Sequence, residues 1–353
     1  MSTPVPAIIL GGTGYVAGEL LRLVLGHPRL ELAAIASDSQ PGEPVADAFP
    51  HLAAACGDLR YASLEQAIGK AAGSPRSAVL AAAPHGVSHK LLDTLLTRAA
   101  AAGSRPAVVD ISADFRFADA GEYARVYKHA HGAPARLAEF TCAVPEHLDH
   151  APTPHVAHPG CFSTATLLAS VPLLALELIE PQIFVSAVTG STGAGRTPIA
   201  GTHHPQRHSD LYAYNVLTHR HAAEITALAR AATGRAARFA FVPHSGPFAR
   251  GIHATVQARL TKRLDTGTAI AALRNFYAGR PFVRVLDEPP RIKDVVASNY
   301  AHLSAVADGE TIVVMSVVDN LVKGAAGGAL QWMNRLLGFD ETDGLLSPAP
   351  GWT

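Results

Sequence analysis

Residues 7–18 read AIILGGTGYVAG, a short apolar run followed by a glycine-rich turn and the start of a helical pattern. The spacing Gly11-x-x-Gly14-x-x-x-Gly18 differs from the usual GxGxxG, but glycines at a strand–helix turn serve the same purpose. They allow a tight turn and let a pyrophosphate approach the N-terminus of the helix. The alternative is a plain connector between the two elements. The position at the head of the first helix favours a dinucleotide site, whose candidate residues are Gly11, Thr13, Gly14, Tyr15 and Val16.

The chain up to Asp110 alternates between strand and helix patterns. We expect strands at residues 7–10, 30–36, 78–83 and 107–110, and helices at residues 15–25, 64–72 and 87–101. This alternation predicts a Rossmann-type α/β domain, in which a parallel sheet is joined by right-handed crossovers. The second strand ends at Ser37 and Asp38. An acid there favours NAD, whereas a hydroxyl residue suits the 2′-phosphate of NADP, so these residues alone leave both coenzymes open.

The pattern changes after residue 110, which indicates a second domain of different architecture. Residues 111–157 are expected to form loops with short elements. Strands are expected at residues 182–188, 238–242, 252–259 and 311–318, and helices at residues 222–232 and 267–277, which together predict an α+β domain. A last helix at about residues 324–337 begins with small residues and is expected to pack on the first domain. The predicted division is residues 1–158 with 324–353 for dinucleotide binding, and residues 159–323 for catalysis, substrate binding and oligomerisation.

Composition excludes several classes of partner. Lys plus Arg and Asp plus Glu both total 29, so the net charge is +0, which argues against nucleic acid or an anionic membrane as a partner. The longest apolar stretch is interrupted by Pro172 and Glu177 and is well short of the ~20 residues of a membrane span. With only 3 cysteines and no signal-peptide pattern at the start, we expect a cytoplasmic protein.

Cys161 follows a Pro159-Gly160 turn and opens a long apolar helical pattern that has no breaker before Pro172. A thiol at a helix N-terminus has a lowered pKa, because unpaired backbone N–H groups stabilise the thiolate. The turn also lets the backbone approach a ligand closely. The alternative is a buried structural cysteine. Combined with the dinucleotide signal, the pattern indicates a cysteine that holds an acyl group while a nicotinamide reduces it.

The candidate acid/base residues are His219 and His221, in a segment just before a helical pattern. A histidine paired with the thiol activates it and later returns a proton. We favour His221 as the acid/base because it adjoins the helix, with His219 orienting the substrate; a surface or structural role is the alternative for both. No HExxH motif or cysteine pair accompanies the other histidines nearby, so no metal is expected at His203, His204 and His208.

Two loops are candidates for anion binding. GSTGAGR at residues 190–196 follows a strand, and its Ser191 and Arg196 suit a carboxylate or phosphate, although an interdomain loop is an equal reading. Arg116 follows the strand that ends at residue 110, at the edge of the sheet where ligands bind in such folds. A salt bridge to Asp114 or Asp119 is the alternative for Arg116.

Beyond these motifs, nearly the whole chain resembles one family, the N-acetyl-gamma-glutamyl-phosphate reductases of arginine biosynthesis. This family is related to aspartate-semialdehyde dehydrogenase, and its second domain is like that of glyceraldehyde-phosphate dehydrogenase. The matching stretches, in the family's order, are GGTGYVAGELLRL (11–23), APHGVSH (83–89), DISADFRF (110–117), HPGCFSTA (158–165), GSTGAGR (190–196), HRHAAEI (219–225), FVPHSGPFARGI (241–252) and DNLVKGAAGGA (319–329).

The resemblance implies a reaction and roles for residues. It implies NADPH-dependent reductive dephosphorylation of N-acetyl-L-glutamyl 5-phosphate to the 5-semialdehyde, through a thioester on Cys161. It also implies a catalytic histidine in the HRH segment, NADP(H) on the glycine turn with Ser37 near the 2′-phosphate, and further coenzyme contacts at Gly193 and Asn320. The expected partners are the acyl phosphate, inorganic phosphate and further copies of the chain, as a dimer or tetramer. The alternatives are an aminoadipyl or aspartyl phosphate substrate, or a nicotinamide-binding regulator without turnover.

Overall fold

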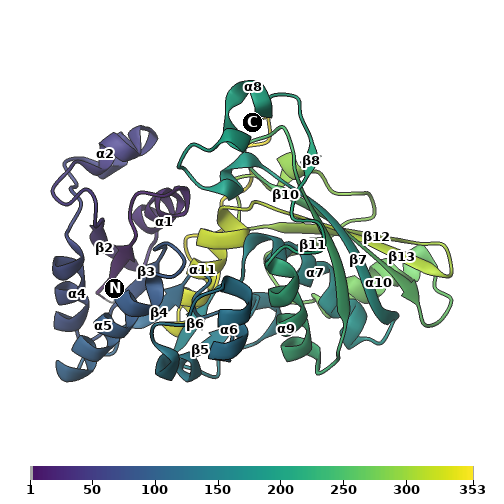
Figure 1. The fold of residues 1–353 in the computed structure, drawn as a ribbon, viewed down its shortest axis with the longest axis horizontal. Helices are drawn as coiled ribbons and strands as arrows, with labels where there is room; N and C mark the ends of the chain where they lie inside the picture. The colour runs from purple at the N-terminus through teal and green to yellow at the C-terminus, as the bar shows by residue number, and fades with distance from the viewer. Residues whose placement is uncertain (1–2, 353) are drawn as a thin grey trace. The chain divides into compact units, whose positions relative to one another are not determined.

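The computed structural model describes residues 3–352, and these form two compact units (Figure 1). The first unit comprises the chain up to Cys142, His150–His158 and Ala326–Leu346. The second comprises Ala143–Asp149, Pro159–Ala325 and the chain from Ser347. Among the described residues, none of the helices combines the length and the apolar character that a bilayer crossing requires.

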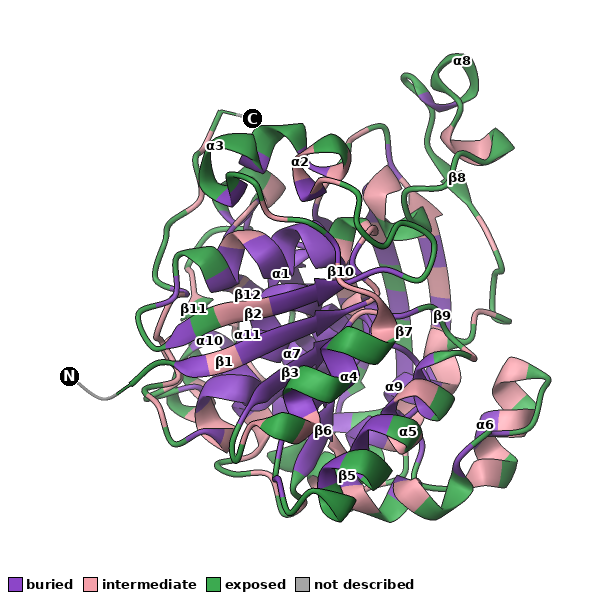
Figure 2. Cartoon of the chain, turned by 90° about the vertical axis from the view of Figure 1, so that its left-hand side faces the viewer, coloured by how far each residue is buried: buried purple, intermediate pink, exposed green. Residues whose placement is uncertain are grey.

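The first unit is built on a six-stranded parallel sheet with the order β2-β1-β3-β4-β6-β5. The central strands are buried on both faces, as expected where helices cover both sides of a sheet; Figure 2 shows them in purple. The strands are β1 (Val5–Leu10), β2 (Leu30–Ala36), β3 (Ala78–Ala81), β4 (Ala107–Asp110), β5 (Phe140–Cys142) and β6 (His155–Ala157). The predicted parallel α/β domain is confirmed.

Helices of the first unit complete its core. Leu92 and Leu95 of α5 and Ala67 of α4 pack on one face of the sheet, against Ile8 and Val79. The helices α1 and α11 contact each other and strands of the same sheet. The helix bounds are α1 (Tyr15–Leu25), α2 (Val45–Ala48), α3 (Ala53–Cys56), α4 (Leu64–Gly73), α5 (Ser88–Ala101), α6 (Ala120–Tyr127) and α11 (Gly327–Leu336).

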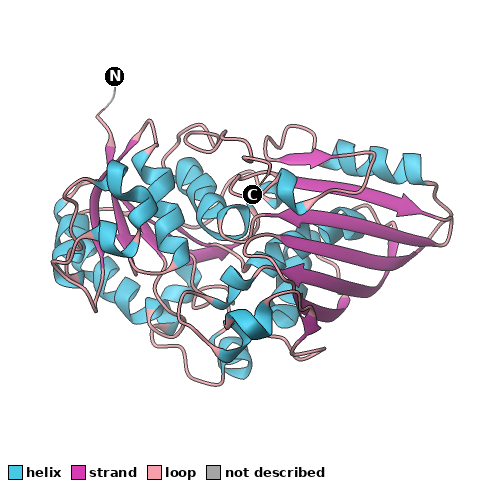
Figure 3. Ribbon diagram, turned by 90° about the horizontal axis from the view of Figure 1, so that it is seen from above, coloured by secondary structure: helices cyan, strands magenta, loops and turns pink. Residues whose placement is uncertain are grey.

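The second unit is built on a seven-stranded mixed sheet with the order β11-β12-β13-β10-β7-β9-β8 (Figure 3). Along β10, buried side chains alternate with more exposed ones, so one face of the strand packs into the core, where α7 contacts it. The strands are β7 (Ile179–Thr189), β8 (Tyr212–Ala213), β9 (Arg238–Ser245), β10 (Ile252–Leu260), β11 (Val283–Val285), β12 (Ala301–Ala307) and β13 (Thr311–Val318). The helices are α7 (Cys161–Ala175), α8 (His204–Arg207), α9 (His221–Thr233) and α10 (Thr266–Phe276). The predicted α+β architecture is confirmed.

The helix α7 continues through Pro172, where the sequence indicated a breaker. Proline has no N–H, so the carbonyl of Leu168, four residues earlier, loses its donor within the helix. The hydroxyl of Tyr277 donates to this carbonyl instead, at 2.7 Å. Tyr277 is 4% exposed, so the replacement bond is made away from solvent.

Other segments also differ from the expectations, among them the short strands β8 and β11, which were not predicted. The strand β12 lies between β11 and β13 but was not predicted, because AHLSAVA lacks a clear alternation and its small residues are almost all buried. The last helix was expected from residue 324; instead Val322–Ala326 forms a π-helical turn, and α11 begins at Gly327. The turn brings the backbone of Gly324 against Cys161: a Cβ built on Gly324 would lie 2.7 Å from the Cβ of Cys161.

Candidate functional site

The glycine turn of the first unit has the geometry of a phosphate cradle. Gly11 has a φ of +82°, and a Cβ there would lie 2.6 Å from the N of Ala83, so this position requires glycine. Gly14 is the N-cap of α1, has no side-chain cap, and no heavy atom lies within 4 Å of a Cβ built on it. The first turn of α1 contains no acidic residue. The N-terminus of α1 therefore has no side-chain cap and has open space beside Gly14, which fits the pyrophosphate of a dinucleotide at the positive end of the helix.

The turn after β2 places Ser37 and Asp38 in different environments. Ser37 is 3% exposed, and its hydroxyl accepts the N–H of Gln40 at 3.2 Å. Asp38 is exposed. The buried position at the end of β2 therefore carries a neutral hydroxyl, and the carboxylate of Asp38 lies in solvent.

The two sequence motifs of the first unit, at residues 83–89 and 110–117, are bound together by a buried carboxylate. Asp114 is fully buried and accepts the N–H groups of Gly86 at 2.8 Å and His89 at 3.0 Å, as well as the hydroxyl of Tyr123 at 3.0 Å. Asp114 therefore holds the loop after β3 beside the loop after β4.

Cys161 is the first residue of α7, with Gly160 as the N-cap. The N–H of Gly160 donates to the carboxylate of Glu224 at 2.7 Å, and Glu224 is fully buried on the first turn of α9. A carboxylate at this end of α7 interacts favourably with the helix dipole and fixes the backbone just before the thiol. Glu224 was not among the predicted site residues, although its position three residues after His221 on a helix placed it near the same face.

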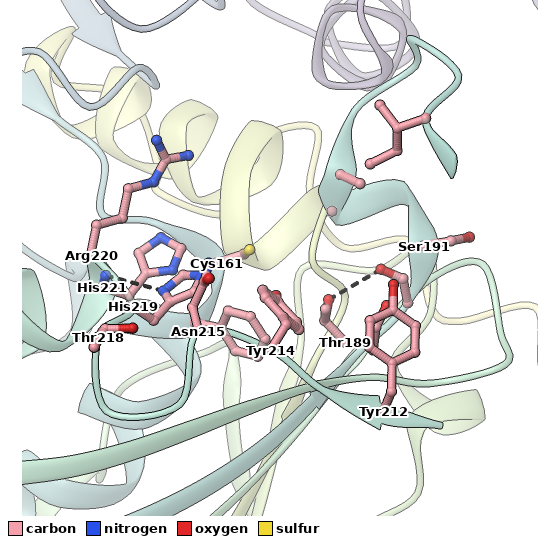
Figure 4. Close-up of a pocket in the computed structure, with 16 residues that line it drawn as sticks. Cys161, Thr189, Ser191, Tyr212, Tyr214, Asn215, Thr218, His219, Arg220 and His221 are labelled. Atoms are coloured by element: carbon pink, nitrogen blue, oxygen red, sulfur yellow. Dashed lines mark hydrogen bonds between the residues drawn. The ribbon is translucent and has the colours of Figure 1, made fainter. Parts of the chain in front are cut away.

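A cavity of about 620 Å³ brings the predicted nucleophile and both histidines together (Figure 4). Its wall is formed by the start of α7, the end of β7 with the following turn, and the segment that leads into α9. The lining residues are Cys161, Phe162, Thr189, Gly190, Ser191, Gly193, Ala194, Ile199, Tyr212, Tyr214, Asn215, Thr218, His219, Arg220, His221 and Ser245. Residues far apart in the sequence therefore form one concave site in the second unit.

The two histidines are stacked, with ring centroids 4.8 Å apart, and both lie edge-on to Phe162. The Nδ1 of His219 accepts the backbone N–H of His221 at 3.2 Å, which keeps this nitrogen unprotonated. Burial, and then the charge of Arg220, lower the pKa of His219 to about 4. His219 is therefore neutral at physiological pH.

Tyr214 lies on the same cavity, and sequence reasoning missed it. Burial raises the pKa of its hydroxyl, and the charge of Cys161 adds to this shift, which places the phenol near the thiol. Its ring centroid is 5.5 Å from that of His219. Tyr214 remains protonated and is a neutral hydrogen-bond donor beside the nucleophile.

The turn after β7, Ser191–Ala194, forms the second wall of the cavity. The backbone fixes this turn: the N–H of Ser191 donates to the carbonyl of Phe248 at 2.9 Å, and that of Thr192 donates to Ala249 at 3.1 Å. Asn320 supports the turn from behind, because its Nδ2 donates to Thr192 Oγ1 at 3.0 Å while its Oδ1 accepts the N–H of Gly251 at 2.7 Å. The predicted contacts of Gly193 and Asn320 with the coenzyme remain predictions.

The two predicted anion-binding arginines have different surroundings. Arg116 is 7% exposed in the first unit, and it donates to the backbone carbonyls of His158 at 3.1 Å and Ile111 at 2.8 Å. Arg196 is exposed and lies two residues beyond the cavity-lining Ala194. Their predicted roles in substrate binding remain predictions.

Comparison with known proteins shows that both units match domains of the semialdehyde dehydrogenases. Residues 6–159 match the family described as semialdehyde dehydrogenase, NAD binding domain, and residues 161–320 match semialdehyde dehydrogenase, dimerisation domain. The N-acetyl-gamma-glutamyl-phosphate reductase of Pseudomonas aeruginosa is 40% identical over 347 residues, which cover 96% of each chain. The protein of that name from Azotobacter vinelandii is 40% identical over 348 residues, 97% of this chain and 98% of its own.

Solved structures show the same fold at much lower identity. Aspartate semialdehyde dehydrogenase II of Vibrio cholerae, complexed with ASA, has a TM-score of 0.68 and 16% identity, covering 96% of this chain and 99% of that chain. Aspartate semialdehyde dehydrogenase with NADP from Candida albicans has a TM-score of 0.62 and 15% identity, covering 95% and 99% of the two chains. At this level of identity the likeness concerns the fold alone.

Proposed function

The chain belongs to the N-acetyl-gamma-glutamyl-phosphate reductase family, and on that premise we propose that it reduces N-acetyl-L-glutamyl 5-phosphate to N-acetyl-L-glutamate 5-semialdehyde, with release of phosphate. It is an oxidoreductase of arginine biosynthesis that uses NADP(H). The observation that carries the proposal is the cavity that joins Cys161, at the start of α7, to His219 and His221.

Cys161 is the proposed nucleophile. Its sulfur attacks the acyl carbonyl, the new S–C bond forms, and the C–O bond to phosphate breaks, which leaves a thioester on the protein. The start of α7 favours the thiolate and offers backbone N–H groups for the negative oxygen that develops. The phosphate departs as an anion and takes the electron pair of the broken bond.

His221 is the proposed acid/base, and His219 the residue that orients the substrate. The Nδ1 of His219 is occupied by a backbone N–H, and its low pKa makes it a poor carrier of a proton near neutral pH. His221 accepts the thiol proton and returns a proton to the oxygen of the reduced carbonyl. The hydroxyl then gives this proton back to His221 as the C–S bond breaks and the C=O bond re-forms, which yields the semialdehyde and frees the Cys161 thiolate.

The residues around the glycine turn fit the coenzyme, which supplies a hydride to the thioester carbon when it is bound. The open N-terminus of α1 would hold the pyrophosphate through the backbone of Gly14, Tyr15 and Val16. Thr13 borders the same turn, and Ser37 would hold the 2′-phosphate.

Binding of the substrate's charged groups completes the proposal. Arg116, Ser191 and Arg196 are the proposed partners of the substrate's carboxylate or phosphoryl group, because guanidinium and hydroxyl donors suit either anion. The second unit is a dimerisation domain, so the chain forms a homo-oligomer. We propose a dimer or tetramer that works in the cytoplasm.

A substrate panel in the reverse direction tests the function. The assay supplies semialdehyde, phosphate and NADP⁺ and follows the absorbance of NADPH. N-acetyl-L-glutamate 5-semialdehyde should be used far better than the aminoadipate or aspartate semialdehyde. Preference for the aminoadipate or the aspartate semialdehyde would assign the corresponding acyl phosphate as the substrate. No turnover with any of the three would favour a nicotinamide-binding regulator without enzymatic activity.

The covalent step is tested by Cys161→Ser. A serine hydroxyl does not ionise at this position, so we expect loss of nearly all turnover with coenzyme affinity unchanged. Cys56→Ala, at a buried position remote in sequence, is the control and should retain activity. Substantial turnover by Cys161→Ser would contradict the thioester route.

A further inference from the structure

Arg207 is a buried cation that has no anionic partner among the described residues. It is the last residue of α8 and is 8% exposed. Its Nη2 donates to the carbonyl of Phe248 at 3.4 Å, while Nε and Nη1 are buried without a hydrogen-bond partner in the described structure. Arginine does not lose its proton in proteins, and a buried charge without a counterion is costly. The arrangement therefore calls for an anion at this side chain.

The position of Arg207 connects it to the cavity of Cys161. The carbonyl of Phe248 that accepts from Arg207 also accepts the N–H of Ser191, at 2.9 Å. Ser191 lines the cavity, as do Ile199 and Tyr212, which lie on either side of α8 in the sequence. The guanidinium is therefore next to the cavity wall formed by the turn after β7.

This wall is the end of the cavity away from the reacting groups. Figure 4 shows Ser191 and Tyr212 on one side of the view, with His219, His221 and Arg220 on the other side of Cys161. An N-acylglutamyl phosphate carries two anionic groups. Its phosphoryl group is attached to the carbon that Cys161 attacks, whereas its carboxylate lies several bonds away at the other end of the acyl chain.

We propose that Arg207 binds the substrate carboxylate and so selects acyl phosphates that carry an acid at the far end of the chain. This rests on the proposed function, because it takes Cys161 as the point of attack. The free Nε–H and Nη1–H groups supply charge-assisted hydrogen bonds, which are stronger than those of neutral donors. The bound carboxylate also provides the missing counterion. Residues 202–214, which include Arg207 and three histidines (His203, His204 and His208), thereby take part in substrate recognition.

The experiment measures both Michaelis constants in the reverse reaction, with Arg207→Met and Arg207→Lys. Arg207→Met should raise KM for the semialdehyde by about tenfold to a hundredfold, the usual cost of losing a hydrogen bond to a charged group. The kcat and the KM for phosphate should stay within about twofold, and Arg207→Lys should restore part of the affinity. Gln206→Met, at the exposed neighbour on the same helix, is the matched control and should behave as wild type.

Two further measurements separate the outcomes. An aldehyde of the same length without the carboxylate should be used equally by wild type and Arg207→Met. Calorimetric titration with N-acetyl-L-glutamate should show weaker binding to Arg207→Met, independently of turnover. An unchanged semialdehyde KM with unchanged binding would overturn the assignment, and so would a rise in the phosphate KM alone. An inactive wild type would instead count against the proposed function. In that case the titration still tests Arg207: equal binding of N-acetyl-L-glutamate to wild type and Arg207→Met would overturn its role as well.

Discussion

Gly324→Ala should impair catalysis by displacing Cys161. A Cβ at residue 324 would lie 2.7 Å from the Cβ of Cys161 and 3.0 Å from its Cα, whereas ordinary contact begins at 3.4 Å. Relief of the closer contact requires a shift from 2.7 to 3.4 Å, or about 0.7 Å. Because a misplacement of about 1 Å costs up to about a hundredfold in rate, we expect kcat to fall by about tenfold to a hundredfold. The φ of Gly324 lies outside the left-handed region, so alanine adds no backbone strain there.

The assay combines kcat in the reverse reaction with the rate at which iodoacetamide alkylates Cys161, read by peptide mass spectrometry. Both should fall in Gly324→Ala, while the affinity for the coenzyme stays unchanged. Gly69→Ala is the control: this exposed glycine on α4 has no atom within 4 Å of an added Cβ, so activity should be kept. Wild-type kcat and alkylation rate in Gly324→Ala would refute the argument that this contact fixes the thiol.

Two further predictions concern stability. Tyr277→Phe removes the donor to the carbonyl of Leu168 in α7, so the free energy of unfolding should fall by about 1–3 kcal/mol; an unchanged denaturation midpoint would show that another group satisfies that carbonyl. Burial lowers the pKa of His155 to about 4, against 6.5 for the free side chain, so the unfolded chain binds more protons between these values. The stabilising contribution of the neutral side chain is complete above about pH 6.5 and is lost as the pH falls toward 4, by at most about 1.4 kcal/mol per pH unit. His155→Gln should therefore show a shallower loss of stability in acid, measured by urea unfolding at a series of pH values, and an identical slope would contradict the burial argument.

Some features of the site could be predicted from local sequence patterns, and others could not. The glycine turn was predictable because a strand, a tight turn and a helix are each encoded by neighbouring residues, and Gly11 has the positive φ that only this residue adopts freely. The start of α7 at Cys161 was predictable for the same reason. That Cys161 shares a cavity with His221 was an inference from chemistry, since no local pattern measures the distance between two elements.

Elements whose hydrophobic period and turn residues agree could be predicted from the amino-acid pattern, including the β–α alternation of the first unit and most strands of the second. Other features depend on packing between elements. The helix α7 passes through Pro172 only because Tyr277, distant in the chain, supplies the missing donor. In the same way, Glu224 reaches the backbone of Gly160, and Arg207 is buried beside the cavity, through packing between segments far apart in the sequence. Such contacts depend on where whole elements lie in space, and a pattern read along the chain reports only the neighbours within one element.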